Sequence, residues 1–434
     1  MPLTRRQVLG GAAATGAAVA GAAGLAGCDG DLPKLAGPPA GWDPGDWGSV
    51  RAQFGLARDV AHLATYVFAP HPAPVRRAIA EHRAGLDRDP IGYLRANEER
   101  LDAAVAGAAA EHLGTAADQV AFTDSTTMGL GLLYGGLRLR PGDEVLTTEH
   151  DFYATHEALR LRAERDGVTV RRVRLYDDPA TASVDEVTGR LAAAAGERTR
   201  VVALTWVHSG TGVKLPIRQL AAAARDRAPG VRVCVDAVHG FGAEATRPAE
   251  LGCDFLVTGC HKWLLGPRGT GLVWGARDAW PDVAATIPTF DGRSIGRWLG
   301  YAAPRVPPGA AHTPGGYHAF EHRWALADAF AFHTAIGRDR VAGRIRELAG
   351  RLKDGLAGIP GVRLVTPRSA ELSAGVVCCA VSGATAEAAV DRLRAAGVVA
   401  SVTPYNPSYL RLGATIANDE DDVDAALRAV RGLL

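Results

Sequence analysis

This chain of 434 residues lacks the cysteine spacings that are typical of metal sites and disulfide-rich domains. Its six cysteines include no Cys-X-X-Cys pair, so the spacing predicts neither a disulfide framework nor a zinc knuckle. Cys378 and Cys379 are neighbours in an apolar run, and Cys234 and Cys253 also lie in apolar segments. Free cysteine is among the most often buried residue types, and we predict that these four side chains pack in the core.

An excess of charge of one sign is also missing. The formal net charge is +1, from 48 Lys and Arg against 47 Asp and Glu, and no long run of like charge occurs. Nucleic-acid binding depends on a basic surface, so the composition predicts no nucleic-acid partner. No internal repeat is apparent. A chain of this length with 47% hydrophobic residues can form one large domain and a smaller one, which favours a small-molecule enzyme.

The N-terminal segment is rich in Ala and Gly and lacks the hydrophobicity typical of a spanning helix. It follows Thr4-Arg-Arg-Gln-Val-Leu9 and ends in Leu25-Ala-Gly-Cys28. This order resembles a twin-arginine export signal, residues 1–28, with a lipoprotein cleavage box. It predicts passage through the twin-arginine translocase, an exported or periplasmic protein and a lipid on Cys28. A transmembrane anchor, or cleavage after an alanine, remains the alternative.

The chain after the predicted signal has the pattern of an α/β protein, because short apolar runs alternate with amphipathic segments of helical length. Residues 29–49 are expected to be a linker. Residues 50–315 are predicted to form a large cofactor-binding domain with a mostly parallel seven-stranded sheet, and residues 316–434 a smaller α+β domain joined by part of residues 50–69. The predicted large-domain strands are 119–123, 144–148, 168–175, 200–206, 231–236, 255–258 and 271–274.

Helices are predicted in both domains from the same patterns. The larger ones are 97–113, ended by Gly114, 128–137, 324–336, 340–359 and 385–396. Shorter strands of the small domain are expected at 362–366, 375–381 and 409–414. The change from alternating strands and helices to two long helices near Pro314 suggests the domain boundary.

Two charged residues follow neighbouring predicted strands. Asp236 ends the apolar part of Val233-Cys-Val-Asp-Ala-Val-His239, and Lys262 lies in Thr258-Gly-Cys-His-Lys-Trp-Leu-Leu-Gly-Pro-Arg-Gly269. Ligands of open α/β sheets bind at the carboxyl ends of the strands. A pyridoxal phosphate site needs an amine that binds the cofactor aldehyde and a carboxylate that keeps the pyridine nitrogen protonated. Lys262 and Asp236 fit these roles, and Lys262 is also the expected general base.

A phosphate site is predicted where a strand leads into a helix, at Ser125, Thr126 and Thr127. The first turn of a helix offers free N–H groups and the positive end of its dipole, and the hydroxyls add donors. N-capping by Ser or Asp would explain the same residues without a ligand. The nearby amine and carboxylate favour the phosphate interpretation.

Contacts to the cofactor ring are predicted from residues that follow other strands. His150 is the first choice for a flat ring that stacks on the pyridine, and Phe152 or Tyr153 could replace it. Ser209 and His239 could hydrogen-bond the ring hydroxyl. These side chains would meet at one sheet edge, because each follows a predicted strand.

The ordered motifs resemble the class V aminotransferase family of fold type I pyridoxal phosphate enzymes, especially its isopenicillin N epimerase-like branch, and also cysteine desulfurases. The matching segments are Ser125-Thr-Thr127, Glu149-His150, Asp236-Ala-Val-His239, His261-Lys262 and Gly266-Pro-Arg-Gly-Thr-Gly271. The resemblance implies pyridoxal 5'-phosphate as the cofactor, with His261 among its contacts. It also implies a homodimer, in which Thr313 reaches the cofactor phosphate of the neighbouring subunit, and Arg411 as the clamp on the substrate α-carboxylate.

Two positions and one segment depart from the family pattern. Ser209 stands where the family often has Asn, and Gly259 where it often has Ser or Thr. The segment Ala400-Ser-Val-Thr-Pro-Tyr-Asn-Pro-Ser408 has no cysteine, whereas a cysteine desulfurase carries its persulfide-forming cysteine on a loop there. These departures favour aminotransferase or epimerase chemistry on an amino acid or a peptide-linked amino acid. A C–S or other β-eliminating lyase, and a non-catalytic surface protein of the same fold, remain the alternatives.

One motif suggests a different chemistry. His318-Ala-Phe-Glu-His322 has the spacing of an inverted zinc-peptidase motif, with two histidines four residues apart on one helical face. No further ligand set is evident in the sequence. We therefore predict no metal at this segment.

Overall fold

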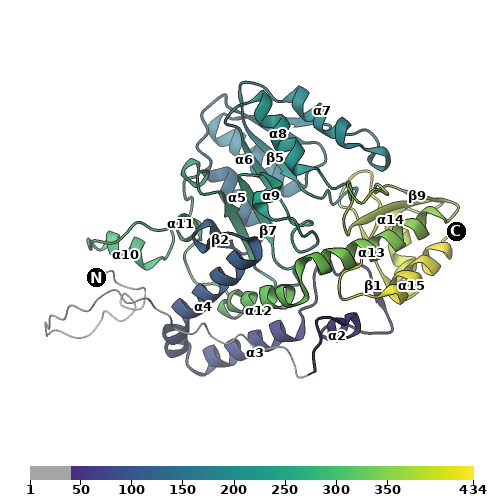
Figure 1. Cartoon of the computed structure of the whole chain (residues 1–434), viewed down its shortest axis with the longest axis horizontal. Coiled ribbons are helices and arrows are strands. Elements are labelled where there is room, and N and C mark those ends of the chain that lie inside the picture. Colours follow the sequence, from purple (N-terminus) through teal and green to yellow (C-terminus); the bar gives the residue numbers. More distant parts are fainter. Residues whose placement is uncertain (1–40) are drawn as a thin grey trace.

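The computed structural model describes residues 41–434, and the predicted signal, with Arg5, Arg6 and Cys28, lies outside this range. A seven-stranded sheet and a four-stranded sheet, each covered by helices, form the two parts of the fold (Figure 1). Within the described residues, no helix has the length and apolar character needed to cross a membrane.

The large sheet has the strand order β2-β8-β7-β6-β5-β3-β4. Only β8 runs antiparallel to its neighbours β2 and β7, and the other neighbours are parallel, which confirms the mostly parallel seven-stranded prediction. Its strands are β2 (Val120–Thr123), β3 (Glu144–Thr148), β4 (Thr169–Val173), β5 (Thr199–Thr205), β6 (Arg232–Asp236), β7 (Phe255–Gly259) and β8 (Gly271–Gly275).

Both faces of this sheet are buried. On β5, Val201 and Ala203 pack in the cluster that contains Leu130 and Leu159, whereas Val202 and Leu204 pack on the opposite side. Successive strand residues point to opposite faces, so a sheet covered on both sides needs continuous apolar strands. The helices after these strands are α5 (Thr126–Gly136), α6 (Tyr153–Asp166), α7 (Val184–Ala194), α8 (Ile217–Arg227) and α9 (Pro248–Leu251).

The small sheet has the order β12-β13-β10-β9, and a separate parallel pair joins β1 to β11. Because β1 comes from the N-terminal part of the chain, the expected contribution of residues 50–69 to the small domain is confirmed. The strands are β1 (Ala61–His62), β9 (Val362–Leu364), β10 (Val377–Val381), β11 (Val398–Val399), β12 (Ser401–Val402) and β13 (Leu410–Leu412). The helices against them are α13 (Arg338–Ala357), α14 (Ala386–Ala395) and α15 (Glu420–Arg431).

The remaining helices join or flank the two sheets. Helix α12 packs against α3 and α4, and α12 and α13 follow each other across the molecule above α3 and α2 in Figure 1. In the same view α10 lies apart from both sheets. These helices are α2 (Trp47–Ala52), α3 (Ala73–Arg88), α4 (Pro90–Leu113), α10 (Gly292–Trp298), α11 (Pro308–His312) and α12 (Phe320–Ile336), with 3-10 turns η1 (Ala117–Gln119), η2 (Pro179–Thr181) and η3 (Trp280–Asp282).

Helix α4 starts seven residues earlier than the predicted 97–113. The Asp89 side chain accepts a hydrogen bond from the Gly92 N–H, and Pro90 occupies the first helical position, where a missing N–H has no cost. The predicted end is confirmed, because Gly114 caps the helix in the left-handed region at φ 66°.

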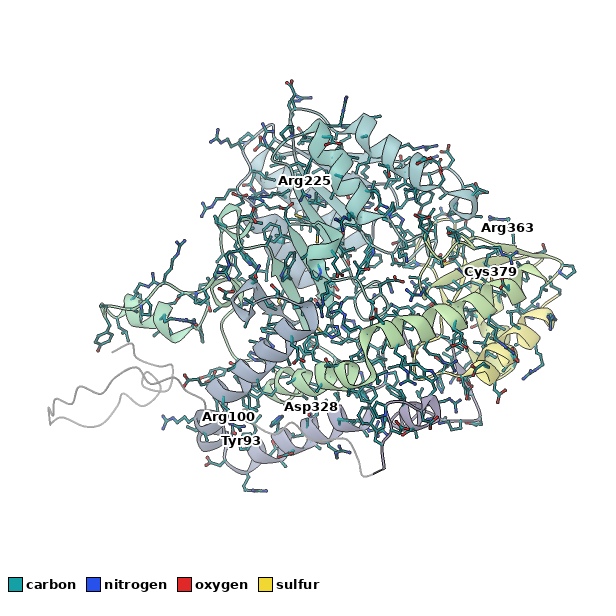
Figure 2. The ribbon with its side chains drawn as sticks, in the orientation of Figure 1. Tyr93, Arg100, Arg225, Asp328, Arg363 and Cys379 are labelled. Carbon is teal, nitrogen blue, oxygen red and sulfur yellow. The ribbon has the colours of Figure 1, made fainter. Side chains whose placement is uncertain are left out.

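The free cysteines of the described residues are buried, which confirms the core prediction for Cys234, Cys253, Cys378 and Cys379. Cys379, labelled in Figure 2, comes from β10 and packs in the core of the small domain. Burial raises the pKa of the Cys378 and Cys379 thiols to about 12, so neither is a thiolate near neutral pH.

Candidate active site

Lys262 and Asp236 come together at the carboxyl edge of the large sheet. Strands β6 and β7 are parallel neighbours, with Asp236 opposite Val257, and Lys262 follows the end of β7 by three residues. Asp236 is 1% exposed. Because both residues leave adjacent parallel strands at the same end, the fold places an amine and a carboxylate at one edge of the sheet.

Lys262 differs from the other lysines of the described residues. Lys214 forms an ion pair with Glu244 at 3.1 Å, and Lys353 donates to backbone carbonyls and to the Ser373 hydroxyl. The Lys262 Nζ instead lies 3.3 Å from the His239 Nε2. Burial lowers the pKa of Lys262 to about 8, with Arg411 acting in the same direction and Asp236 opposing them. A substantial fraction of this amine is therefore neutral and nucleophilic at mildly alkaline pH.

Asp236 has one carboxylate oxygen engaged and one available. Its Oδ1 accepts a hydrogen bond from the Val238 N–H at 3.0 Å, and within residues 41–434 no hydrogen bond involves Oδ2. Burial raises the pKa of Asp236 to about 6, while the Val238 N–H and Lys262 favour the ionised form. A protonated ring nitrogen placed against Oδ2 would give this buried carboxylate a partner, which is what a pyridoxal site requires.

The start of α5 fits a phosphate group. Ser125 caps the helix by accepting from the Met128 N–H at 3.1 Å, so its hydroxyl proton is free to donate. The Thr126 hydroxyl is buried and has no hydrogen-bond partner among the described residues. Gly259 lies close by, since an added Cβ there would be 3.1 Å from Thr126 Oγ1. Thr127 is exposed on the first turn. An unpartnered buried hydroxyl at a helix N-terminus is suited to an anion.

His150 has one covered face. Its ring stacks on Tyr176 with centroids 3.9 Å apart and planes 6° apart, so only the opposite face can stack on a pyridine. Burial lowers the pKa of His150 to about 3, and the ring is therefore neutral. Of the two reserves, Tyr153 is 69% exposed, and Phe152 packs edge-on against Tyr405 with centroids 6.3 Å apart. His150 remains the best placed of the three.

Arg411 reaches from the small domain to the large one. Its Nη1 donates to the Ser209 carbonyl at 3.2 Å and its Nε donates to the Ser401 hydroxyl at 3.1 Å. The guanidinium also lies 5.5 Å from the Tyr66 ring centroid. No carboxylate of the described residues lies within ion-pair distance of this largely buried cation. It therefore offers donors for a substrate carboxylate.

The Ser209 side chain contacts Tyr405. Its hydroxyl lies 2.8 Å from the Tyr405 hydroxyl, and an added Cβ at Gly210 would be 2.8 Å from the Tyr405 ring. Tyr405 belongs to residues 400–408, which lack a cysteine. A tyrosine thus projects from this loop to Ser209, the position where the family often has Asn.

Two residues implied by the resemblance make local contacts. The Thr313 hydroxyl accepts from the Phe122 N–H at 3.0 Å and donates to the Gly309 carbonyl at 2.9 Å, so its proton is used within its own chain. His261 is half-buried, and its Nδ1 has no partner among the described residues. Burial lowers the pKa of His261. The side chains of Thr313 and His261 play no part in placing Lys262 and Asp236 at one edge of the sheet.

The zinc-like segment does not form the helix that its motif requires. Helix α12 begins at Phe320, so His318 precedes it and does not share a helical face with His322. The His318 ring packs near Phe320, with centroids 4.3 Å apart. Across the described residues no group of three or more His, Cys, Asp or Glu side chains could hold a metal ion.

Sequence reasoning missed four residues that border the site: Tyr66, Tyr176, Trp263 and Tyr405. Each is aromatic and reaches the site through a ring contact or a hydroxyl. Trp263 directly follows Lys262, and Tyr405 lies in the loop already singled out, so both had a signal in the sequence. Tyr66 and Tyr176 had none, because they are brought in from distant segments.

Comparisons with known proteins show which family and which solved folds this chain is similar to. The model of the aminotransferase class-V family matches residues 103–425. Isopenicillin N epimerase of Streptomyces clavuligerus is 27% identical over 406 residues, which covers 89% of this chain and 98% of the epimerase. A probable cysteine desulfurase of Mycobacterium leprae is 28% identical, covering 78% of this chain and 82% of the relative. A solved structure of the cystine C-S lyase C-DES in complex with cysteine persulfide has a TM-score of 0.77 at 23% identity, covering 87% and 98% of the two chains.

Proposed function

Because this chain belongs to the class-V aminotransferase family, we propose that it acts at the α-carbon of an amino acid or a peptide-linked amino acid, by transamination or epimerisation. It is a pyridoxal phosphate-dependent enzyme of that family. When bound, pyridoxal phosphate withdraws electron density from the α-carbon and so acidifies its proton. The residues around Lys262 perform the remaining tasks.

Each task has a residue suited to it. Lys262 would bind the cofactor, and the same Nζ would remove the α-proton. Asp236 Oδ2 would accept from the ring N–H, and the free face of His150 would cover the ring. Ser125 and Thr126 would donate to the phosphate at the start of α5. Arg411 binds the α-carboxylate and thereby orients the α-carbon toward Lys262.

The absence of a thiol on the loop of residues 400–408 carries the choice of reaction. Persulfide chemistry needs a nucleophilic cysteine within reach of the substrate. Cys378 and Cys379 are buried in β10, and burial raises the pKa of both thiols. Tyr405 stands on this loop instead, hydrogen-bonded to Ser209. This combination supports proton transfer at the α-carbon without a persulfide on the protein.

Solvent exchange tests the proposal. The holoenzyme is incubated in deuterated buffer with a panel of amino acids and small peptides, and mass spectrometry follows the α-proton of each. We expect exchange for at least one substrate, together with either a new stereoisomer or a keto acid. Protein-bound persulfide formed from cysteine would contradict the proposal, and a panel with no exchange at all would reject the proposed reaction at the α-carbon.

A C–S or other β-eliminating lyase is the second candidate. The similarity in fold to a cystine C-S lyase and the absence of a loop cysteine both fit it. Elimination also begins with removal of the α-proton, and it then expels a β-substituent and releases aminoacrylate, which water converts to pyruvate and ammonia. Pyruvate formed from cystine or a related thioether would identify this reaction.

We also propose that the enzyme is a homodimer in which Thr313 approaches the cofactor phosphate of the second subunit. The exposed aromatic residues Trp298 and Tyr301 on and after α10 support a subunit contact, as does a cavity of about 650 Å³ lined by Thr313 and residues of α4. The Thr313 hydroxyl donates to the Gly309 carbonyl in the single chain, so it would have to rotate in order to donate to the phosphate. Light scattering gives the subunit number. A monomeric holoenzyme would contradict the proposal.

Export by the twin-arginine translocase, and a lipid anchor on Cys28, complete the proposal. Support comes from Arg5, Arg6 and the Ala- and Gly-rich stretch that follows them. This route would deliver the enzyme to the periplasm or another extracytoplasmic location. Cell fractionation tests it.

A further inference from the structure

Trp263, the residue after Lys262, is tightly packed in the core. Its side chain is 1% exposed, and its ring is stacked on Tyr66 with centroids 5.3 Å apart and planes 20° apart. Gly375 leaves room for it, since a Cβ there would lie 2.3 Å from the Trp263 Cη2. Close packing on both sides leaves the indole a single position.

The indole N–H points at His239. The Trp263 Nε1 donates to the His239 Nδ1 at 3.2 Å. An indole nitrogen can only donate, so the Nδ1 that accepts from it must carry a lone pair. His239 is 3% exposed, and burial holds its pKa well below the usual value, with Lys262, Arg411 and His261 acting in the same direction. The ring is therefore neutral, and its proton lies on Nε2.

The Nε2 of the same ring faces the catalytic amine. It lies 3.3 Å from the Lys262 Nζ. With its proton on Nε2, His239 donates, and Lys262 must accept with the lone pair of a neutral amine. A Lys262 ammonium would place two donors against each other. His239 could relieve this only by moving its proton to Nδ1, where it would oppose the indole N–H.

We propose that Trp263 is a positioning residue that fixes the tautomer of His239 and thereby holds the Lys262 amine neutral, with its lone pair directed at the His239 Nε2. The proposal rests on the function of Lys262 given above. Lys262 would thus be ready to bind the cofactor aldehyde or to receive an α-proton. The other charged groups that act on the amine are Asp236 on β6, which favours the ammonium, and Arg411 on β13, which opposes it.

A direct test measures the tautomer. The apo form of the wild-type protein, labelled with ¹⁵N-histidine, is examined by long-range proton–nitrogen correlation, and His239→Gln assigns the signal. We expect a protonated Nε2 and a bare Nδ1 at neutral pH. In Trp263→Phe, which keeps a ring against Tyr66 but removes the donor, we expect the Nδ1–H form to appear. A protonated Nδ1 in the wild-type protein would overturn the proposal, even if the variant did not fold.

A second measurement follows Lys262 itself. Apo-protein is mixed with pyridoxal phosphate at a series of pH values, and absorbance gives the rate of covalent capture, which requires a neutral amine. We expect the midpoint of this profile to rise by about one pH unit in Trp263→Phe, a tenfold shift in the ratio of ammonium to amine. An unchanged midpoint would also overturn the proposal.

The matched control is Trp324→Phe. Its buried indole donates to Asp102 at 2.9 Å, and Trp324 lies in α12, in a different core cluster from Trp263. This variant loses the same N–H and similar packing, so it should leave the His239 tautomer and the capture profile unchanged. Failure of solvent exchange with an intact tautomer would reject the proposed function and leave the role of Trp263 standing. Intact exchange with the proton of His239 on Nδ1 would leave the proposed function standing and reject the role of Trp263.

Discussion

The hydroxyl groups of Ser209 and Tyr405 lie 2.8 Å apart, which joins the large sheet to a loop of the small domain. Ser209 follows β5, and its carbonyl accepts a hydrogen bond from Arg411. Burial raises the pKa of Tyr405, so its phenol keeps its proton at neutral pH. Ser209 therefore contacts both Arg411, the proposed ligand of the substrate carboxylate, and Tyr405 on the loop of residues 400–408 that lacks a cysteine.

Tyr405→Phe should reduce kcat/KM about fivefold, because the Ser209 hydroxyl loses a hydrogen bond of about 1 kcal/mol. The α-proton exchange rate measures the effect. Tyr409→Phe is the control, since Tyr409 directly follows this loop and its ring lies near Arg363, 5.8 Å from the guanidinium carbon. An equal loss in both variants would show that the loop, rather than the contact with Ser209, is responsible.

Lys262→Ala should abolish covalent attachment of pyridoxal phosphate. Borohydride reduction followed by peptide mapping detects the labelled lysine. Lys214→Ala, which removes an amine paired with Glu244, should still be labelled on Lys262. Label found on Lys214 or Lys353 of the wild-type protein would show that the amine has been assigned to the wrong residue.

Arg411→Ala should weaken substrate binding roughly 10- to 150-fold, because it removes a charge-assisted contact worth about 1.5 to 3 kcal/mol. Cofactor binding should change little. KM and a pyridoxal phosphate titration separate the two effects. Arg363→Ala is the control, because this arginine, labelled in Figure 2, lies on β9 of the same small sheet and is not part of the site. A cofactor affinity that falls as much as the substrate affinity would contradict the assignment.

The apo-protein should lose stability as the pH falls from 6.5 toward 4. Burial lowers the pKa of His71 and His333 to about 4 and that of His150 and His208 to about 3. In this window the unfolded chain binds more protons, and each histidine contributes up to about 1.4 kcal/mol per pH unit. Burial raises the pKa of Asp236 to about 6, so protonation of this one carboxyl stabilises the folded chain as the pH falls and opposes the effect of the four histidines.

Urea unfolding at several pH values measures this slope. His333→Gln should reduce it by about one histidine's contribution, whatever its effect on the stability at pH 7. A slope that does not change in this variant would mean that His333 titrates alike in the folded and unfolded chains.

Replacing Arg5 and Arg6 together by Lys should leave the protein in the cytoplasm, because the weakly hydrophobic stretch after them is poorly suited to the general secretory route. Fractionation and immunoblotting follow the mature form. Cys28→Ala should be exported but released from the membrane. Normal export of the double variant would reject the twin-arginine interpretation, and membrane retention of the second variant would reject lipidation.

Much of the large domain could be predicted from the sequence. The apolar runs that became β3, β6 and β7 were found to within a residue or so, because strands buried on both faces require continuous apolar sequence. The same runs locate Asp236 and Lys262. The zinc-like segment was harder, since spacing alone cannot tell that α12 begins only at Phe320.

The sequence by itself determined the α/β class, the positions of Lys262 and Asp236 at strand ends, and the missing cysteine, since these follow from local pattern and residue identity. Only the tertiary structure decided what surrounds them. Tyr66 and Arg411 are separated by more than three hundred residues, yet they meet beside Trp263 and His239. Such contacts depend on how β1 joins the small domain and how that domain packs against the large sheet. The hydrophobic periodicity of one segment cannot predict this packing, because the packing is stabilised by contacts between segments that are far apart in the sequence.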